Sequence, residues 1–327
     1  DQPRSRGLGD VYKRQLVEKY IGVKAEDVIV ASTGVIGQPM TLEPFQKNFG
    51  KLADSLEDTP AGGTRAAEAI MTTDTVSKEV AVRFPLGGKM CKLGGISKGS
   101  GMIAPNMATM LCFLTTDAAI SPVPLKRALT TVTADTFNML SIDGDTSTND
   151  MVSILANGMA GNTPIESCMG ADYEAFVAAL YKVCEKLCAI MAKDGEGATK
   201  LLVCEVTGAK STAAAKLVAK AVIKSTLLKA AIFGADANWG RVLCAIGYAG
   251  ADVDVSKVDV NFRSNRGLIP VCRGGAGVAF SEETAKEILM DDEITVQVAL
   301  NSGSATAKAW GCDLTYDYVK INGDYRT

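Results

Sequence analysis

One segment of the chain combines residue types that can carry out covalent chemistry. Lys98 stands in a glycine-containing loop, a proline-containing linker comes next, and Thr109 opens an apolar stretch over residues 110–114. Small residues, Ala108 among them, would let the Thr109 hydroxyl approach the carbonyl carbon of the preceding residue. Hydrolysis of the resulting ester would free Thr109 as an N-terminus whose α-amine, with a reference pKa of about 8, acts as its base. A threonine that simply opens a buried strand is the competing interpretation.

The absence of one residue type narrows the chemistry further. The sequence contains no histidine, which excludes Ser-His-Asp and Cys-His sites and the usual histidine-containing zinc sites. A nucleophile in this chain must therefore take its base from a lysine, a carboxylate or a free α-amine.

Charge and cysteine usage indicate the class of protein. The 327 residues carry 34 Lys and Arg against 37 Asp and Glu, a net charge of −3, which argues against nucleic acid or an anionic membrane as partner. Apolar stretches stop short of the roughly 20 residues that span a bilayer. Nine cysteines form no CxxC pair, and such scattered thiols are typical of buried free cysteines in a reducing compartment, so we expect a cytoplasmic protein.

Strand and helix patterns alternate along the chain from Leu16 onward. Together they predict an α/β fold with antiparallel strands toward the C-terminal end. The predicted strands are residues 28–31, 110–114, 201–206, 258–262, 268–272 and 294–300. The predicted helices are residues 64–71, a helix from Ser121 toward Leu140, a helix from Asp172 to Met191, and a helix capped by Ser211 that continues through Leu228, while residues 310–321 read as irregular to helical.

The first fifteen residues differ from the rest of the chain. Residues 1–15 are polar, rich in Arg and Gly and without periodicity, so we interpret them as a non-native leader and leave them out of the fold prediction. We expect the native beginning of the protein to be missing, and strand edges exposed by that loss to promote association.

Seven sequence blocks together resemble one enzyme family. They are KGSGMIAPNMATMLCFLTTDA, ASTGVIG, MTTDT, SIDGDTSTND, DGEGATK, ANWGR and DYVKING. Together they are similar to the glutamate N-acetyltransferase, or ornithine acetyltransferase, family of bifunctional arginine-biosynthesis proteins, here N-terminally truncated. The resemblance implies a layered αββα sandwich like that of N-terminal-nucleophile hydrolases, with a smaller C-terminal α/β portion.

The resemblance also implies self-cleavage between Ala108 and Thr109. Residues 16–108 would form an α chain and residues 109–327 a β chain. Thr109 would take the acetyl group from N2-acetyl-L-ornithine as an ester and pass it to L-glutamate, with acetyl-CoA open as a second donor and no cofactor. An α2β2 heterotetramer is the implied assembly. Two alternatives stay open: an aminopeptidase or amidase on the same scaffold, and a binding protein without activity.

Further site residues follow from the same blocks, each with a plainer interpretation beside it. Thr33 and Gly34 match the oxyanion hole of the family, although a glycine there is also typical of a turn. The substrate-contacting positions are Thr72, Lys98, Thr109, Glu196, Asn322 and Thr327. Without the resemblance, Lys98 is typical of a solvated loop charge, Glu196 of an acidic turn, and Thr327 of a frayed chain end.

No metal site is predicted. Asp143, Asp145 and Asp150 have spacing loosely like a calcium loop, but the distal bidentate glutamate is absent. We therefore expect this block to be a structural loop near the site, with side chains bonded to the backbone. Cys184 and Cys188 lie one helical turn apart and are expected to be buried rather than to bind metal.

Overall fold

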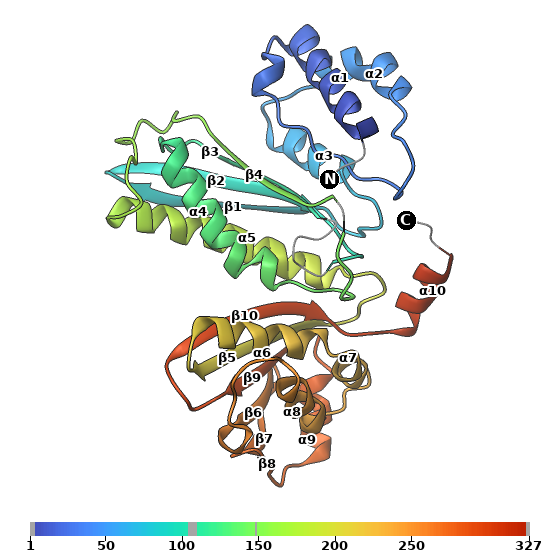
Figure 1. The fold of residues 1–327 in the computed structure, drawn as a ribbon, viewed down its shortest axis with the longest axis vertical. Coiled ribbons are helices and arrows are strands. Elements are labelled where there is room, and N and C mark those ends of the chain that lie inside the picture. Colours follow the sequence, from blue (N-terminus) through green and yellow to red (C-terminus); the bar gives the residue numbers. More distant parts are fainter. Residues whose placement is uncertain (1–3, 104–109, 148, 325–327) are drawn as a thin grey trace. The chain divides into compact units, whose positions relative to one another are not determined.

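The computed structural model describes residues 4–103, 110–147 and 149–324. The chain divides into two units, residues 1–69 with 325–327 and residues 70–324, which are considered separately (Figure 1). The first unit is helical in its described part, and the second contains both β-sheets.

The first unit consists of three helices and their connections. The helices are α1 Arg4–Ile21, α2 Glu43–Asp54 and α3 Pro60–Ala69, with a 3₁₀ turn at Ala25–Asp27. Helices α1 and α2 pack together, and the ring centroids of Tyr20 and Phe49 lie 5.8 Å apart. Helix α1 runs through residue 15 without a break, so the segment interpreted as a leader is helical from Arg4.

The strand predicted at residues 28–31 is wrong. These residues and the adjoining Ser32, Thr33 and Gly34 form an irregular connection. A strand needs a hydrogen-bonded neighbour, and the described part of this unit contains no strand that could pair with it. The apolar run alone could not reveal that missing partner.

The first sheet of the second unit has the order β1-β2-β3-β4. Its strands are β1 Lys78–Leu86, β2 Lys89–Lys98, β3 Leu111–Thr116 and β4 Met151–Ala156. The first two pairings are antiparallel, whereas β3 and β4 run parallel. Helix α5, Ala171–Lys193, covers one face, and its predicted apolar stripe packs on β1 and β2, with the rings of Phe84 and Phe176 in edge contact at 6.1 Å.

The second sheet has the order β10-β5-β9-β6-β7-β8. Its strands are β5 Leu201–Ala209, β6 Asp259–Ser264, β7 Gly267–Arg273, β8 Ala276–Gly277, β9 Glu293–Ala299 and β10 Ala305–Cys312. The remaining helical elements are α4 Pro122–Asp135, α6 Thr212–Lys224, α7 Thr226–Phe233, α8 Trp239–Gly247, α9 Glu282–Leu289 and α10 Tyr316–Asp324, with 3₁₀ turns at Phe137–Met139 and Val255–Lys257.

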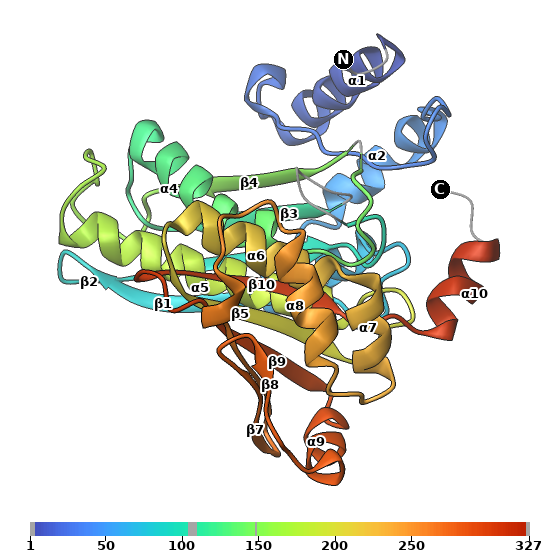
Figure 2. The same cartoon turned by 60° about the horizontal axis from the view of Figure 1, so that its bottom comes forward.

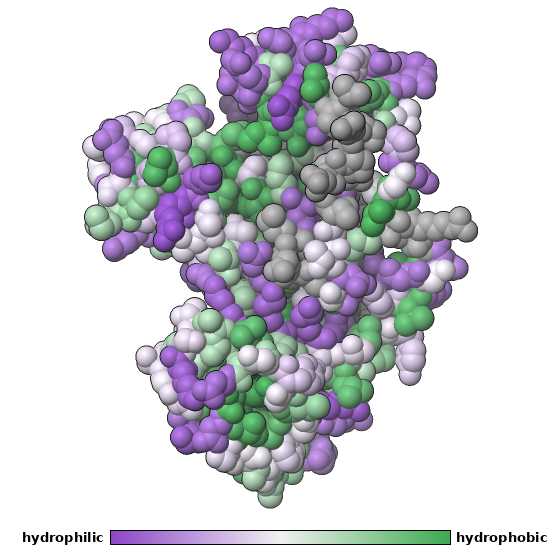
Figure 3. Space-filling view, viewed as in Figure 1, coloured by the Kyte–Doolittle hydropathy of each residue, from purple (hydrophilic) through white to green (hydrophobic). Residues whose placement is uncertain are grey.

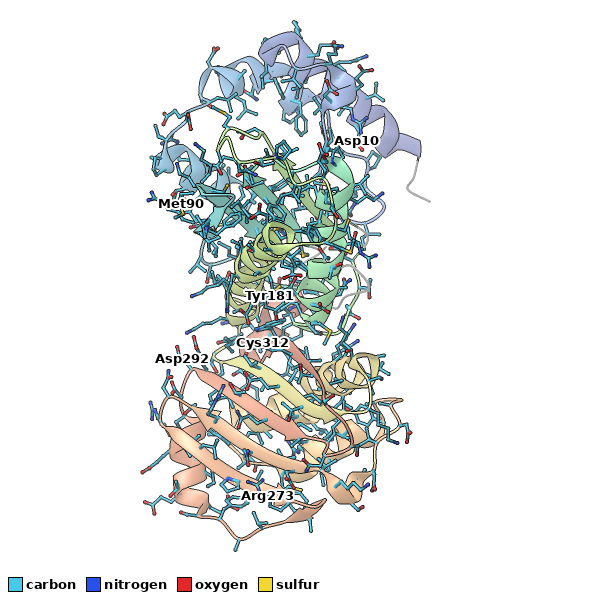
Figure 4. All side chains as sticks on the ribbon, turned by 90° about the vertical axis from the view of Figure 1, so that its left-hand side faces the viewer. Asp10, Met90, Tyr181, Arg273, Asp292 and Cys312 are labelled. Carbon is cyan, nitrogen blue, oxygen red and sulfur yellow. The ribbon has the colours of Figure 1, made fainter. Side chains whose placement is uncertain are left out.

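Helix α5 connects the two sheets. It contacts β1 and β2 of the first sheet and β5 and β10 of the second, and α6 also packs on β5 and β10 (Figure 2). Tyr181 of α5 lies close to this junction and Cys312 lies at the end of β10 (Figure 4). The predicted layered α/β class, with sheets flanked by helices and a smaller C-terminal portion, is confirmed.

Several boundaries differ from the prediction: the helix predicted from Ser121 toward Leu140 ends at Asp135, and the one predicted at residues 64–71 spans Pro60–Ala69. The helix capped by Ser211 ends at Lys224, because Ser225 adopts extended angles and its hydroxyl caps α7 by accepting a hydrogen bond from the Leu228 amide. The segment from Trp310 begins inside β10 rather than as irregular chain, since Trp310 pairs with Val203 of β5. Local hydrophobicity fits either assignment, and the tertiary partners decide.

Seven cysteines are buried as expected, Cys184 and Cys188 among them, but Cys168 and Cys244 are exposed. In the described ranges, none of the helices is long and apolar enough to cross a membrane. Figure 3 shows apolar residues over β3 and β4, whereas the surface near β10 is mostly hydrophilic. The chain therefore presents polar and apolar regions in different places on this face.

Candidate active site

Several of the sequence blocks meet at one end of the first sheet, where β2 ends and β3 and β4 begin. Lys98 is the last residue of β2 and pairs with Leu111, the first residue of β3. Leu111 pairs in turn with Met151, the first residue of β4. The antiparallel and parallel pairings thus bring the end of β2 and the beginnings of β3 and β4 into one row, next to Met110.

A buried ion network joins two further blocks to this row. The Lys78 ammonium is fully buried and donates to Asp74 Oδ1 at 2.6 Å and to Asp194 Oδ2 at 2.5 Å. Asp74 also accepts the Gly99 amide at 2.7 Å, and Asp194 accepts hydrogen bonds from the backbone amide and hydroxyl of Thr75. One lysine therefore joins the MTTDT block, the loop after Lys98 and the DGEG block.

Burial and nearby charges shift the pKa values of Asp74 in the network and of the neighbouring Lys98. Burial raises the pKa of the Asp74 carboxyl, but hydrogen bonds from the Gly99 amide and the Lys78 ammonium outweigh it and hold that pKa below its ordinary value. Burial lowers the pKa of the Lys98 ammonium, and the negative charges of Asp74, Asp150 and Glu196 offset this only in part. Lys98 is 3% exposed, so its side chain is buried rather than solvated on a loop.

Glu196 and Asn322 are brought together. The Asn322 side-chain amide donates to Glu196 Oε2 at 2.8 Å, and the Glu196 backbone amide donates to the Ser100 carbonyl at 2.7 Å. Gly101 allows this approach, because a Cβ atom there would collide with the Glu196 carboxyl group. Gly197 has a φ of +66°, and a Cβ atom there would meet the Tyr318 backbone. Gly197 therefore needs glycine, and a side chain at position 101 would displace the Glu196 carboxylate from this place.

The DGDTSTND block holds the backbone on both sides of residues 104–109. Asp143 accepts the amides of Met102 at 2.6 Å and Ile103 at 2.9 Å. Asp150 accepts the Met110 amide at 2.8 Å. The expected structural loop with side chains bonded to the backbone is thus present, and it borders the segment that contains Thr109.

Asp150 has an unusual protonation equilibrium. Burial raises the pKa of its carboxyl to about 7, although the Met110 amide and the Lys98 charge act in the opposite direction. Within the described ranges, no group of three or more His, Cys, Asp or Glu residues could hold a metal ion. Asp143 and Asp150 of this block bind backbone amides instead.

The first two threonines of the MTTDT block have separate partners. The Thr72 amide donates to Asp74 Oδ2 at 3.1 Å, whereas the Thr73 hydroxyl lies 2.6 Å from the Ser100 hydroxyl. Thr73 is therefore the threonine of this pair that bonds the glycine-containing loop, and Thr72 stays a predicted substrate contact.

The remaining predicted site residues are not among the described residues of the second unit. Thr33 and Gly34 belong to the first unit, in its irregular connection. Ala108, Thr109 and Thr327 lie outside the described residues. Within the second unit, an open cavity of about 520 Å³ lies between the DGEG loop and α10, lined in part by Thr75, Asp194 and Ile321.

Sequence reasoning missed the residues that assemble the site. Lys78 lies in none of the seven blocks; Asp74 and Asp150 lie in two of them, but Asp74 is given no role there, and Asp150 only that of a loop residue. A signal for Lys78 exists: alternation along β1 places it on the same face as Val80, Val82 and Phe84, which turns toward α5. A lysine on that face needs a buried anionic partner.

Comparison with known proteins identifies relatives along nearly the whole chain. The ArgJ family profile matches residues 5–327. The arginine biosynthesis bifunctional protein ArgJ 1 of Clostridium acetobutylicum is 51% identical over 309 residues, 94% of this chain and 75% of the relative. The ArgJ protein of Geobacillus stearothermophilus is 46% identical over 324 residues, 99% of this chain and 77% of the relative.

A solved structure agrees with this result. The crystal structure of the arginine biosynthesis bifunctional protein ArgJ from Bacillus halodurans matches with a TM-score of 0.62 and 47% identity, and the match covers 65% of this chain and 98% of that chain. Sequence and fold agree, and the chain belongs to the ArgJ family.

Proposed function

We propose that this chain transfers an acetyl group from N2-acetyl-L-ornithine to L-glutamate through an ester on Thr109. Membership of the ArgJ family makes it an acyltransferase of arginine biosynthesis. The observation that carries the finer proposal is the combination of a buried cation, Lys98, with a buried carboxylate, Glu196, beside the strand that begins after Thr109. Opposite charges at one site suit amino-acid substrates, which carry both a carboxylate and an ammonium group.

Self-cleavage supplies the nucleophile in this proposal. The Thr109 hydroxyl attacks the Ala108 carbonyl carbon, the peptide C–N bond breaks, and the acyl group moves to oxygen. Water then hydrolyses the ester, which leaves the Ala108 carboxylate and a free α-amine on Thr109.

Acetyl transfer then proceeds in two balanced steps. Thr109 Oγ attacks the acetyl carbonyl of N2-acetylornithine, the amide C–N bond breaks, and ornithine leaves with the proton taken from the hydroxyl. The α-amine of glutamate attacks the ester, the C–O bond breaks, and Thr109 Oγ regains a proton. Thr33 and Gly34 would stabilise the oxyanion of each tetrahedral intermediate.

Substrate recognition divides between the charged groups. Lys98 would bind the α-carboxylate that both substrates share, with Thr72 as an additional donor. Glu196, held by Asn322, would bind the amino end of the ornithine side chain. Thr327 is the further predicted contact. We extend the proposal to acetyl-CoA as a second acetyl donor, to an α2β2 assembly and to a cytoplasmic location; the word "bifunctional" in the relatives' names supports the second donor.

The decisive experiment combines mass and transfer measurements. Intact-mass spectra under denaturing conditions should give two chains, separated between Ala108 and Thr109, for the wild type and one chain for Thr109→Ala. Labelled acetyl groups from N2-acetylornithine should appear on glutamate only with the wild type. Acetyl release that does not depend on glutamate would instead identify a hydrolase, and an uncleaved, inactive wild type would refute the proposal.

A further inference from the structure

Among the described residues, Asp150 has the side chain that accepts a hydrogen bond from the amide of Met110, the residue that follows Thr109. Its Oδ1 accepts the Met110 amide at 2.8 Å, and that amide nitrogen is covalently joined to the Thr109 carbonyl carbon. On the other side of Met110, its carbonyl accepts the Met151 amide at 3.1 Å. Residues 150 and 151 therefore hold both peptide groups of Met110 immediately before the β3–β4 ladder begins.

Lys98 lies in the same row as Asp150, because Lys98 pairs with Leu111 and Asp150 bonds the amide of the adjacent Met110. Lys98 interacts electrostatically with Asp150, and within the described ranges it forms no ion pair of the kind that joins Lys78 to its two carboxylate partners. Asp74, Lys78 and Glu196 are the other charged groups that act on Lys98. When ionised, above a pH of about 7, Asp150 is thus one of three carboxylates that favour the protonated form of Lys98.

Asp143 provides an internal comparison in the same block. It accepts the amides of Met102, Ile103 and Asp145 and the hydroxyl of Tyr318, which is the bonding of a carboxylate that shapes a loop. Among the described residues, Asp150 accepts the Met110 amide, and the Lys98 charge acts on it electrostatically. This difference indicates a role beyond loop structure.

We propose that Asp150 is a positioning residue for Thr109, which holds the peptide between Thr109 and Met110 and keeps the neighbouring Lys98 ammonium charged for carboxylate binding. This inference rests on the proposed acetyl transfer. The roles of the hydrogen bond and of the charge can be tested separately by substitution. Asn at position 150 keeps an oxygen acceptor for the Met110 amide but removes the charge, whereas Ala removes both.

The test compares Asp150→Asn and Asp150→Ala with Asp145→Asn, which removes an exposed carboxylate from the same block. Self-cleavage is followed by intact mass, and kcat and KM for glutamate are measured as a function of pH. Asp150→Asn should cleave like the wild type, but its alkaline limb of kcat/KM should move to lower pH, because Lys98 loses its proton more readily without the neighbouring anion. Asp150→Ala should cleave more slowly and lose kcat on the order of 10–100-fold, as expected for a misplaced reacting group.

Each outcome decides the inference. If both Asp150 variants match Asp145→Asn in cleavage, kcat and pH profile, Asp150 is not a positioning residue. If Asp150→Ala does not fold, the pH profile of Asp150→Asn alone decides, and an unshifted limb overturns the link with Lys98. A wild type that neither cleaves nor transfers acetyl groups refutes the proposed function itself, and the inference falls with it.

Discussion

Single side chains in this site gain their properties from burial and from one or two neighbours. Lys98 and Glu196 are nearly inaccessible to solvent, yet both are ionisable and act on each other electrostatically. Such groups keep their charge only when nearby charges or hydrogen bonds compensate for lost hydration. The chemistry of each residue therefore depends on partners that are distant in sequence.

Asp150 makes stability depend on pH in a predictable direction. Its pKa in the folded chain is about 7, against an ordinary value of 3.8, so the folded state holds this proton more tightly than the unfolded chain. The favourable contribution is complete below pH about 4 and is lost as pH rises through about 7. Asp150→Asn removes this loss, so its Tm relative to the wild type should increase from pH about 4 to about 7 and then level off. Thermal unfolding across this range, with Asp145→Asn as control, tests the prediction; a constant Tm difference would contradict it.

Gly101 controls the position of the Glu196 carboxylate. Gly101→Ala would place a methyl group against the Glu196 carboxyl carbon and displace the carboxylate from Asn322. We expect the same rise in KM for N2-acetylornithine as in Glu196→Gln, about 10–100-fold, because a charge-assisted hydrogen bond contributes about 1.5–3 kcal/mol. Steady-state kinetics of both variants check this. Gly247→Ala, in α8 with open space around it, is the matched control and should leave KM unchanged.

At the scale of elements, the buried ion network ties β1 to the end of α5. Lys78 is the first residue of β1, and Asp194 directly follows α5. Lys78→Met would leave two buried carboxylates without a cation, so we expect a loss of about 3–5 kcal/mol in the free energy of unfolding, as for other broken buried pairs. Lys193→Met breaks an exposed pair with Asp292 and should cost no more than about 1 kcal/mol. Urea unfolding of both variants makes the comparison, and equal losses would show that the buried network contributes little.

The elements predicted best are those with strong periodicity. The apolar spacing from Asp172 predicts α5, and alternation predicts β6, β7 and β9, because these segments bury a regular face. The predictions of a strand at residues 28–31 and of an uninterrupted helix after Ser211 are wrong, since pairing partners and the cap at Ser225 decide those regions.

The candidate site is predictable only in part. Motifs indicate Lys98, Glu196 and Asn322, which the fold brings into one region. The partners that position them are only partly predictable: alternation along β1 marks Lys78 as buried, and the DGDTSTND block marks Asp150 as a side chain bonded to the backbone, but the groups that they meet depend on strand order and burial. Motif recognition therefore finds the residues proposed to meet substrate more readily than those that hold them in place.

At the scale of the whole molecule, the predicted cleavage point falls between strands that pair with each other. Strands β1 and β2 precede it and β3 and β4 come after it, yet β2 and β3 form a continuous antiparallel ladder from Lys98–Leu111 to Leu93–Thr116. Helix α5, from the later part, covers β1 and β2. A cut between Ala108 and Thr109 would therefore leave one sheet and one core built from two chains.

We accordingly expect the cleaved chains to remain together without a covalent link. Native size-exclusion chromatography should give one peak that contains both chains, which separate only in denaturant. Phe84→Ala should weaken this association, because Phe84 packs against Phe176 across the cut, and removal of a buried aromatic ring costs about 3–5 kcal/mol. Met90→Ala, at an exposed position on β2, is the control and should leave the single peak intact. A freely separating β chain in the wild type would mean that the shared sheet does not hold the two chains together.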